Sequence, residues 1–498
     1  MTDTHARPYL RGITPYLIFL VVTVTLGPLQ FGFHLAELNA PHDAITCKNR
    51  QEKPSDFLLQ WLPECLPMSE SEFAFVSSIF TLGGLLGALS AGPVSTRFGI
   101  LISMRIATLA SLIGASHEAL ASHVSMLVLG RLLAGVGAGI SLVVVPLYVS
   151  EVAPPQSKGS FGAATQIAVN LGILLTLVSG YIFGQDSEWR IALAVGAGFA
   201  VLQGVLLCAV SESPAWTATN RDPELALSIL KRIRGTGIDL AEEIRNWNVG
   251  TPKTIADELD SLLFEEESIR YGAMSPSTHK ETTKQVGFLE VAGSPQYRPA
   301  LIAVVGVMMA QQLTGINSVM MYSVELMSSI FPTTSTLLTI MLSLINLLTT
   351  ILCAPLPDKL GRKPALLLSI TGMGFSSLAL AFSMLFSIKI LSAVSAICFV
   401  ASFGVGIGAI PFILASELVD QEASSATQGW GLAANWIATF SIAQFCPMIN
   451  DALNSKFGGT GWVYFIFTAL ALISAIFVVC CVPETQKTGH VEEPWERT

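Results

Sequence analysis

The chain has 498 residues, of which 51% are hydrophobic and only 13% are charged, and its mean hydropathy is +0.60. A soluble chain usually carries about a quarter of charged residues, so this composition predicts an integral membrane protein with many spans. The net charge of -9 and the scattered basic residues exclude a nucleic-acid partner.

Twelve apolar runs are long enough to cross a bilayer. The first begins near residue 13, and no cleavable signal is evident before it. The runs fall near residues 13–36, 73–95, 103–121, 124–149, 162–184, 190–210, 299–327, 334–356, 365–387, 390–415, 427–448 and 460–482. We therefore predict an all-α membrane protein, with an N-terminal six-helix bundle over 1–210 and a C-terminal six-helix bundle with a short tail over 299–498.

A polar, charged segment over 211–298 separates the two bundles. The helix-like stretches 224–234 and 255–269 predict that this linker contains short amphipathic helices on the cytoplasmic side. With both termini in the cytoplasm, about 20 of the 27 basic residues fall on that side, as the positive-inside rule requires. We expect the plasma membrane, with a vacuolar or endosomal membrane as the alternative.

The eight cysteines show no metal-ligand spacing, and we expect neither a metal nor a cofactor. Cys47 and Cys65 share the polar loop over 38–72, and they could form a disulfide if that loop faces an oxidising compartment. The sequence leaves this pairing open because it cannot give the separation of the two residues. No Ser-His-Asp order or nucleotide loop stands out, so we do not expect an enzyme.

The two halves repeat three landmarks in the same order. These are a glycine in a turn with basic residues, a glutamate at a membrane end after a proline, and an acidic turn. The pairs are Gly99 and Gly361, Glu151 and Glu417, and Glu212 and Glu484, at offsets of 262, 266 and 272 residues. A duplicated six-helix unit with a binding site between its halves is a transporter plan.

The segment Gln311-Gln312-Leu313-Thr314-Gly315-Ile316-Asn317 places three carboxamides, a hydroxyl and a glycine inside an uncharged apolar run. Polar groups inside a membrane are costly and usually face the protein interior. On a regular helix Gln311 and Asn317 would point about 120° apart. Gly315 weakens the helix, so local unwinding could bring both side chains into one cavity. Neutral donors and acceptors suit an uncharged, polyhydroxylated ligand.

Further polar side chains lie in matched spans of the two halves. Gln166 on the fifth span and Asn346 on the eighth each share a helix face with a second polar residue four positions on. On the eleventh span Asn435 precedes Trp436, whose indole can pack against the apolar face of a sugar ring. A lone asparagine in a span is as often a contact between helices, but the occurrence in both halves favours a binding site.

Several motifs resemble one family. They are Gln30-Phe31-Gly32-Phe33, Gly130-Arg131, Pro146-Leu147-Tyr148-Val149-Ser150-Glu151-Val152, Glu212-Ser213-Pro214, the 311–317 segment, Gly361-Arg362-Lys363, Pro411 with Glu417, Asn435-Trp436 and Pro483-Glu484-Thr485. With them the chain resembles the sugar porters of the major facilitator superfamily, similar to facilitative glucose transporters of animals and hexose transporters of fungi. The resemblance covers nearly the whole chain apart from the loops and implies the major facilitator fold. It implies sugar contacts at Gln166, Gln311, Gln312, Asn317, Asn346 and Asn435, and a cavity aromatic at Trp436.

The resemblance also implies a network of salt bridges at the cytoplasmic span ends, which locks one state and must break in the other. Its members would be Arg97, Glu151, Lys158, Glu212, Asp358, Arg362, Glu417 and Glu484. The alternative is that these charges only set the topology. For Glu151 and Glu417 we favour the network, because the positive-inside rule does not call for acids there.

The chain departs from the family pattern at a few positions. Ile100 and Leu101 follow Gly99 where two basic residues are usual, and Ala215 and Ser424 stand where arginine is common. These departures predict a weaker cytoplasmic latch. Phe412 replaces a tryptophan typical of glucose carriers, so we assign it to the substrate site and leave the particular sugar open.

The first span carries ionisable residues near its outer end. His34 and Glu37 are three positions apart and share a helix face, and Arg131 on the fourth span should lie at a similar depth. By the resemblance, His34 falls where proton-coupled relatives carry aspartate and facilitative ones carry asparagine. Histidine has an ordinary pKa of about 6.5, so these residues are candidates for proton coupling. Alternatively, Glu37 simply pairs with Arg131 and His34 is structural.

Together these features predict a transporter of a monosaccharide, expected to be a hexose, that works as a monomer by alternating access. Its partners would be the sugar and the lipid bilayer. We favour facilitated diffusion, with proton-coupled symport through His34, Glu37 and Arg131 as the first alternative. A second alternative is a non-transporting sugar sensor, which the short tail of about 15 residues disfavours.

Overall fold

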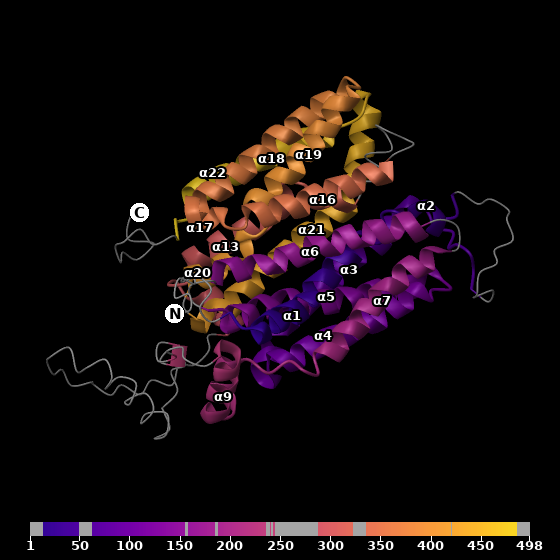
Figure 1. Cartoon of the computed structure of the whole chain (residues 1–498). Coiled ribbons are helices and arrows are strands. Elements are labelled where there is room, and N and C mark those ends of the chain that lie inside the picture. The colour runs from indigo at the N-terminus through magenta and orange to yellow at the C-terminus, as the bar shows by residue number, and fades with distance from the viewer. Residues whose placement is uncertain are drawn as a thin grey trace, which may run out of the picture.

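A computed structural model describes residues 13–48, 62–154, 158–184, 188–235, 240, 243–244, 287–321, 335–419 and 421–485. Within these residues all regular structure is helical (Figure 1). Twelve of the described helical segments are long and apolar enough to cross a membrane, which confirms the predicted number of spans. The helices run side by side, and we call the two ends of the molecule the α2 end and the α9 end after the short helices found there.

The first half contains six long helices and the short α2. They are α1 (Pro15–Ala36), α2 (His42–Ile45), α3 (Glu70–Phe98), α4 (Ile100–Ala119), α5 (Val124–Val152), α6 (Lys158–Phe183) and α7 (Trp189–Leu206). The start of α3 is fixed by a capping box, in which the Ser69 hydroxyl accepts from the Glu72 N–H and the Glu72 carboxylate accepts from the Ser69 N–H. The helices α3 and α5 approach so closely that a side chain at Gly83 would overlap the backbone of Leu132, and glycine at this position makes the approach possible.

The linker begins with α8 (Pro214–Asn220) and α9 (Pro223–Arg234). The predicted helix over 224–234 is thus confirmed, whereas the one predicted over 255–269 lies outside the described residues. Proline at the first turn and the Asp222 cap explain where α9 starts. Arg234 fastens α9 to the first half, since its guanidinium donates to the Val152 and Ala153 carbonyls at 2.5 and 3.1 Å.

The second half contains ten helices among the described residues. They are α12 (Phe288–Gly293), α13 (Arg298–Leu313), α14 (Ile316–Met321), α16 (Ser335–Cys353), α17 (Leu356–Leu360), α18 (Arg362–Leu385), α19 (Lys389–Val405), α20 (Ile410–Leu418), α21 (Gln421–Phe457) and α22 (Val463–Cys481). Two predicted spans are therefore interrupted. The seventh breaks between α13 and α14, as the glycine at 315 suggested. The tenth breaks between α19 and α20, where Gly406 caps the end of one helix and Pro411 lies in the first turn of the next.

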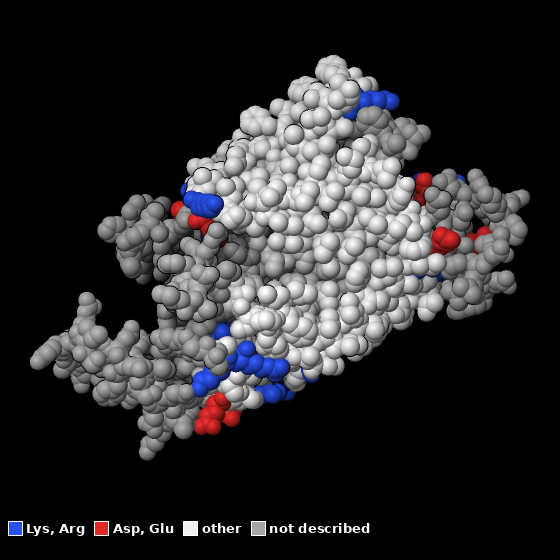
Figure 2. All heavy atoms as spheres, viewed as in Figure 1, with Lys and Arg blue, Asp and Glu red and all other residues white. Residues whose placement is uncertain are grey.

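The two halves meet along α3 with α21 and α6 with α16, and Figure 1 shows these helices between the indigo-to-magenta and orange-to-yellow groups. On the face drawn in Figure 2, Lys, Arg, Asp and Glu gather at the two ends and leave an uncharged band between them. Large apolar side chains such as Leu352 and Phe375 are 76% and 74% exposed. A bilayer would cover such a band, since exposing so large an apolar surface to water is unfavourable.

Candidate functional site

The break in the seventh span lies at Thr314 and Gly315. Gly315 has φ +96°, a backbone conformation that favours glycine, and an added Cβ would stand 2.8 Å from the Phe467 ring. The Gly315 N–H donates to the Gln312 carbonyl at 2.9 Å and closes the last turn of α13. The chain then restarts as α14, which turns Asn317 back toward Gln312 despite their separation of five residues.

Four carboxamides converge at this break, and we call them the carboxamide cluster: Gln311, Gln312, Asn317 and Asn435. Asn317 Nδ2 donates to Gln312 Oε1 at 2.6 Å, and Gln312 Nε2 donates to Asn435 Oδ1 at 3.1 Å. Asn435 Nδ2 in turn donates to Gln311 Oε1 at 2.8 Å. All four side chains are buried. The predicted unwinding therefore does bring Gln311 and Asn317 into one group.

The carboxamide cluster also joins the two broken spans. Gln311 Nε2 donates to the carbonyls of Ile407 and Gly408, at 2.8 and 3.1 Å, in the break between α19 and α20. Broken helices expose backbone carbonyls that a continuous helix would use internally. A hydroxylated ligand offers both donors and acceptors, so it can replace such amide–amide bonds without leaving a buried group unpaired.

A second polar group lies between the halves. Gln166 Nε2 donates to Asn170 Oδ1 at 3.0 Å, and Asn346 Nδ2 donates to the same oxygen at 3.3 Å. Asn170 Nδ2 donates to Thr350 Oγ1 at 2.8 Å, so the group connects α6 with α16. Gln166 is thus linked to the eighth span through Asn170. Asn346 Oδ1 has no partner among the described residues and is free to accept from a ligand.

Aromatic side chains pack around Trp436, which follows Asn435 of the carboxamide cluster on α21. Trp436 is 2% exposed, and its ring meets Phe31 edge-on at 5.4 Å and Phe80 at 6.1 Å between centroids. An added Cβ at Gly84 would stand 2.5 Å from the indole. The indole Nε1 has no hydrogen-bond partner among the described residues. Phe412 is partly buried against the same core.

At the α9 end the second half forms an ion-pair network. Arg362 pairs with Asp358 at 2.6 Å and with Glu417 at 2.9 Å, and Glu417 also accepts from the Thr485 hydroxyl at 2.5 Å. Glu484 instead accepts from the backbone N–H groups of Arg362 and Lys363, at 2.8 and 3.1 Å. These N–H groups begin α18, where a helix leaves its donors unpaired.

The first half repeats this helix-start contact without the arginine. Glu212 accepts from the Leu101 N–H at 3.0 Å, near the start of α4, and the Ser213 hydroxyl donates to Glu151. Burial raises the pKa of the Glu212 carboxyl above its ordinary value, although these backbone N–H groups oppose the shift. Arg97 is exposed, and its guanidinium lies 5.3 Å from the Phe98 ring centroid instead of joining the two acids. The Lys158 side chain lies outside the described residues.

The repeated glycines now have a physical reason. Gly99 and Gly361 have φ +100° and +101°, and each precedes the helix whose first N–H groups a glutamate accepts. A Cβ at Gly361 would stand 2.6 Å from a Glu484 carboxylate oxygen, and one at Gly99 would overlap the Glu212 carboxylate. Both the backbone conformation and the close carboxylate therefore require glycine.

Four ionisable side chains are enclosed between α1, α4 and α5, and we call them the charged cluster: His34, Glu37, Glu118 and Arg131. His34 Nδ1 lies 3.0 Å from both Glu37 oxygens. Arg131 Nη1 donates to Glu37 Oε1 at 2.5 Å and to the His34 carbonyl at 2.6 Å. Sequence reasoning missed Glu118, although an acid inside the predicted span over 103–121 was a visible signal.

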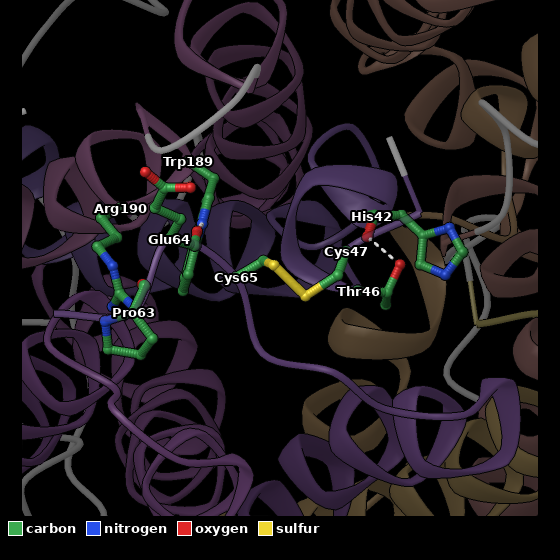
Figure 3. The surroundings of a disulfide bond; sticks show 8 residues. All are labelled: His42, Thr46, Cys47, Pro63, Glu64, Cys65, Trp189 and Arg190. Carbon is green, nitrogen blue, oxygen red and sulfur yellow. Dashed lines mark hydrogen bonds between the residues drawn. A yellow bond between two sulfur atoms is a disulfide. The ribbon is translucent and has the colours of Figure 1, made fainter. Parts of the chain in front are cut away.

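The structure contains a disulfide between Cys47 and Cys65, with their Cα atoms 5.4 Å apart (Figure 3). Trp189 Nε1 donates to the Glu64 carbonyl at 2.8 Å, and Arg190 Nη2 donates to the Pro63 carbonyl at 2.7 Å. The disulfide and these bonds tie the segment after α2 to the start of α7.

Replacing Cys47 and Cys65 together by serine is expected to lower the free energy of unfolding by about 3 kcal/mol, because the bond constrains a loop of about 18 residues in the unfolded chain. Denaturant unfolding in detergent micelles measures the change, and reductant should reproduce it in the wild type. The exposed Cys208 provides the control Cys208→Ser. Equal midpoints for all three proteins would contradict the expectation.

Comparisons with known proteins agree on one family. A family model described as sugar (and other) transporter matches residues 20–495. A probable metabolite transport protein of Saccharomyces cerevisiae is 28% identical over 97% of this chain and 96% of that protein. The facilitated glucose transporter member 3 of solute carrier family 2 from Rattus norvegicus is 30% identical over 95% of this chain and 91% of that protein.

Solved structures show the same fold. The proton:xylose symporter XylE, bound to 6-bromo-6-deoxy-D-glucose, superposes with a TM-score of 0.73, covers 95% of this chain and 97% of that one, and is 24% identical. The inward-open conformation of the xylose transporter XylE from E. coli gives a TM-score of 0.69, with 96% and 99% covered and 23% identity. The predicted major facilitator architecture is therefore confirmed.

Proposed function

The chain belongs to the sugar transporter family of the major facilitator superfamily, and from this premise we propose that it carries a hexose through a site built from the carboxamide cluster and the Gln166 group. The single observation that carries the proposal is the closure of the carboxamide cluster across two broken helices. Buried amides that satisfy one another in the absence of ligand can exchange those bonds for sugar hydroxyls at little cost. Trp436, with its unpaired Nε1, would cover one side of the ring.

Alternating access would separate the halves at each end in turn. At the α2 end Asn39 Nδ2 donates to the Met320 carbonyl at 3.0 Å, and the Ser78 hydroxyl donates to Gln444 Oε1 at 2.7 Å, so side chains join the halves there. At the α9 end the ion pairs of Arg362 stay within the second half. A cavity of about 300 Å³ lies there between α3, α5, α12 and α21. This arrangement supports a state whose α2 end is closed.

We place both termini in the cytoplasm, following the basic residues, with the α2 end outside the cell at the plasma membrane. The disulfide at that end suits an oxidising exterior. A single chain supplies both polar groups, so we propose the monomer as the transporting unit. Facilitated diffusion requires no groups beyond this sugar site and the alternating opening of the two ends. The charged cluster supports a second candidate, proton-coupled symport, because buried ionisable groups inside a span are costly without a function.

The test is counterflow of D-glucose in proteoliposomes, with D-galactose, D-mannose, D-fructose and D-xylose as competitors. Asn317→Ala removes the Nδ2 group that donates to Gln312 Oε1 and to the Thr439 hydroxyl, and it leaves Gln312 Oε1 unpaired. Gln166→Ala removes the equivalent contact to Asn170. Each is expected to slow counterflow about tenfold, which corresponds to about 1.4 kcal/mol.

Asn220→Ala on α8 is the matched control, since Asn220 is exposed and bonds only its own helix turn. Wild-type counterflow in both site variants would remove these residues from the site. Saturable binding of these sugars with no flux in the wild type would instead indicate a sensor. The absence of both binding and flux would contradict transport of a hexose.

A further inference from the structure

The charged cluster does not balance its own charge. It holds two carboxylates, Glu37 and Glu118, but a single guanidinium, that of Arg131. All four residues are at most 3% exposed, so water does not screen their charges. With both carboxylates ionised and His34 neutral, the cluster carries one uncompensated negative charge. An isolated buried charge costs several kcal/mol, and proteins neutralise it by a proton or a counter-ion.

No other cation among the described residues offsets this charge. The Arg190 guanidinium on α7 donates to backbone carbonyls instead, from Nη1 to Ala119 at 3.0 Å and from Nη2 to Pro63. His117, on α4 itself, bonds the Ile113 carbonyl. His123 before α5 is exposed and bonds the Ser122 carbonyl. From α3 the Phe80 ring lies 4.6 Å from the Arg131 guanidinium, and from α7 Gly196 lies beside His34.

The hydrogen bonds indicate which side chain of the charged cluster binds the neutralising proton. Glu37 already accepts from Arg131 and lies beside His34 Nδ1, so the guanidinium compensates the negative charge of the Glu37 carboxylate. A protonated His34 would carry a second N–H at Nε2, and that atom has no acceptor among the described residues. Both Glu118 oxygens are buried and lack any donor. Glu118 is therefore the group whose ionised form is left without support.

A proton at Glu118 resolves both defects. It cancels the surplus charge, and it gives Glu118 an O–H that can donate to Glu37, since the ligand atoms of His34, Glu37 and Glu118 lie within 4.8 Å of one another. A divalent metal ion at the same place would leave one surplus positive charge beside Arg131. Two close carboxylates that share one proton are a familiar arrangement in proteins.

We propose that Glu118 is the proton-binding group of this transporter, and that its protonation is coupled to sugar movement. This inference rests on the proposed function and deepens its second candidate by moving the proton from His34 to Glu118. The Phe80 ring links the two sites, because it lies under Arg131 and also meets Trp436, at 6.1 Å between ring centroids. When Glu118 loses its proton, it competes with Glu37 for Arg131 and can shift the guanidinium over that ring.

The test follows sugar and protons in the same proteoliposomes. Wild-type protein is expected to accumulate D-glucose when the interior is more alkaline, and addition of D-glucose should alkalinise a weakly buffered exterior. Glu118→Gln cannot exchange a proton but keeps the size and polarity of the side chain. It should keep D-glucose counterflow within about threefold of the wild type and lose the proton uptake entirely. Glu118→Asp should retain proton uptake with a displaced pH profile.

His34→Asn separates the two possible carriers, and it is expected to retain proton uptake. Glu188→Gln, at the exposed start of α7, controls for loss of a carboxylate at the same end of the molecule. If Glu118→Gln does not fold, the comparison of Glu118→Asp with His34→Asn still decides between the carriers.

The outcomes separate this inference from the proposed function. Absence of wild-type counterflow for every sugar tested would contradict the transport function itself. Counterflow without sugar-induced proton uptake would overturn only the inference, as would proton uptake that survives Glu118→Gln or disappears in His34→Asn. Accumulation that follows a sodium gradient at constant pH would replace the proton by a metal cation and would equally overturn it.

Discussion

Replacing Arg131 by methionine is expected to lower the free energy of unfolding by about 3–5 kcal/mol, because it leaves a buried carboxylate without its cation. Methionine keeps much of the apolar volume of the arginine side chain, so the loss reports the charge rather than a cavity. Arg131 also donates to the His34 carbonyl at 2.6 Å and stacks on Phe80, and both contacts disappear with it. Denaturant unfolding in detergent micelles measures the change.

A second variant identifies the cause of that loss. In the double variant Arg131→Met with Glu37→Gln, the buried negative charge is gone as well, and we expect at least half of the lost stability to return. Lys389→Met, at an exposed position where α19 begins, controls for removal of a positive charge. If Arg131→Met were no more destabilising than Lys389→Met, the charged cluster would contribute nothing to stability.

The spans were predictable because their signal is local. An apolar run of about 20 residues crosses a bilayer whatever its neighbours are, so composition and length alone gave the twelve spans. The break at Gly315 was also suggested by its neighbours in sequence. The break between α19 and α20 was missed, because residues 390–415 form one apolar run that predicts a single span. Glycine and proline are common in continuous membrane helices, so only the carbonyls bonded to Gln311 reveal it.

Contacts between helices were less predictable, because spacing along one helix does not fix its rotation against another. The shared face of Gln166 and Asn170 was correct, but the partner of Asn170 on α16 required the packed structure. Glu118 illustrates the same difficulty. Its position inside a span was visible, yet nothing in the sequence placed it beside Glu37 and Arg131.

The repeated landmarks were predictable from the sequence, but the contacts expected of them were only partly correct. Glu212 and Glu484 both accept backbone N–H groups where a helix begins, and this contact needs a glycine but no arginine. It explains why Ile100 and Leu101 are tolerated in the first half, where basic residues were expected. A backbone donor has no side-chain identity, so residue types alone could not indicate this contact.

Gly315→Val is expected to slow D-glucose counterflow about a hundredfold, which corresponds to about 2.7 kcal/mol. A β-branched residue cannot adopt φ +96° without strain, and its Cβ would stand 2.8 Å from the Phe467 ring. The chain must then either displace Phe467 or straighten the break between α13 and α14. Straightening would turn Asn317 away from Gln312 and open the carboxamide cluster. Counterflow in proteoliposomes, with the amount of folded protein determined by size-exclusion chromatography, measures the effect.

Two further variants separate the causes of this loss. Gly198→Val on α7 adds the same side chain at an exposed position with nothing within 4 Å, and it should stay within about twofold of the wild type. Gly315→Asn tolerates a positive φ but keeps the Cβ, so a milder loss than with valine would assign the effect to the backbone, and an equal loss would assign it to Phe467. Near-normal counterflow in Gly315→Val would mean that the break is not required, and the carboxamide cluster would then lose its role as the sugar site.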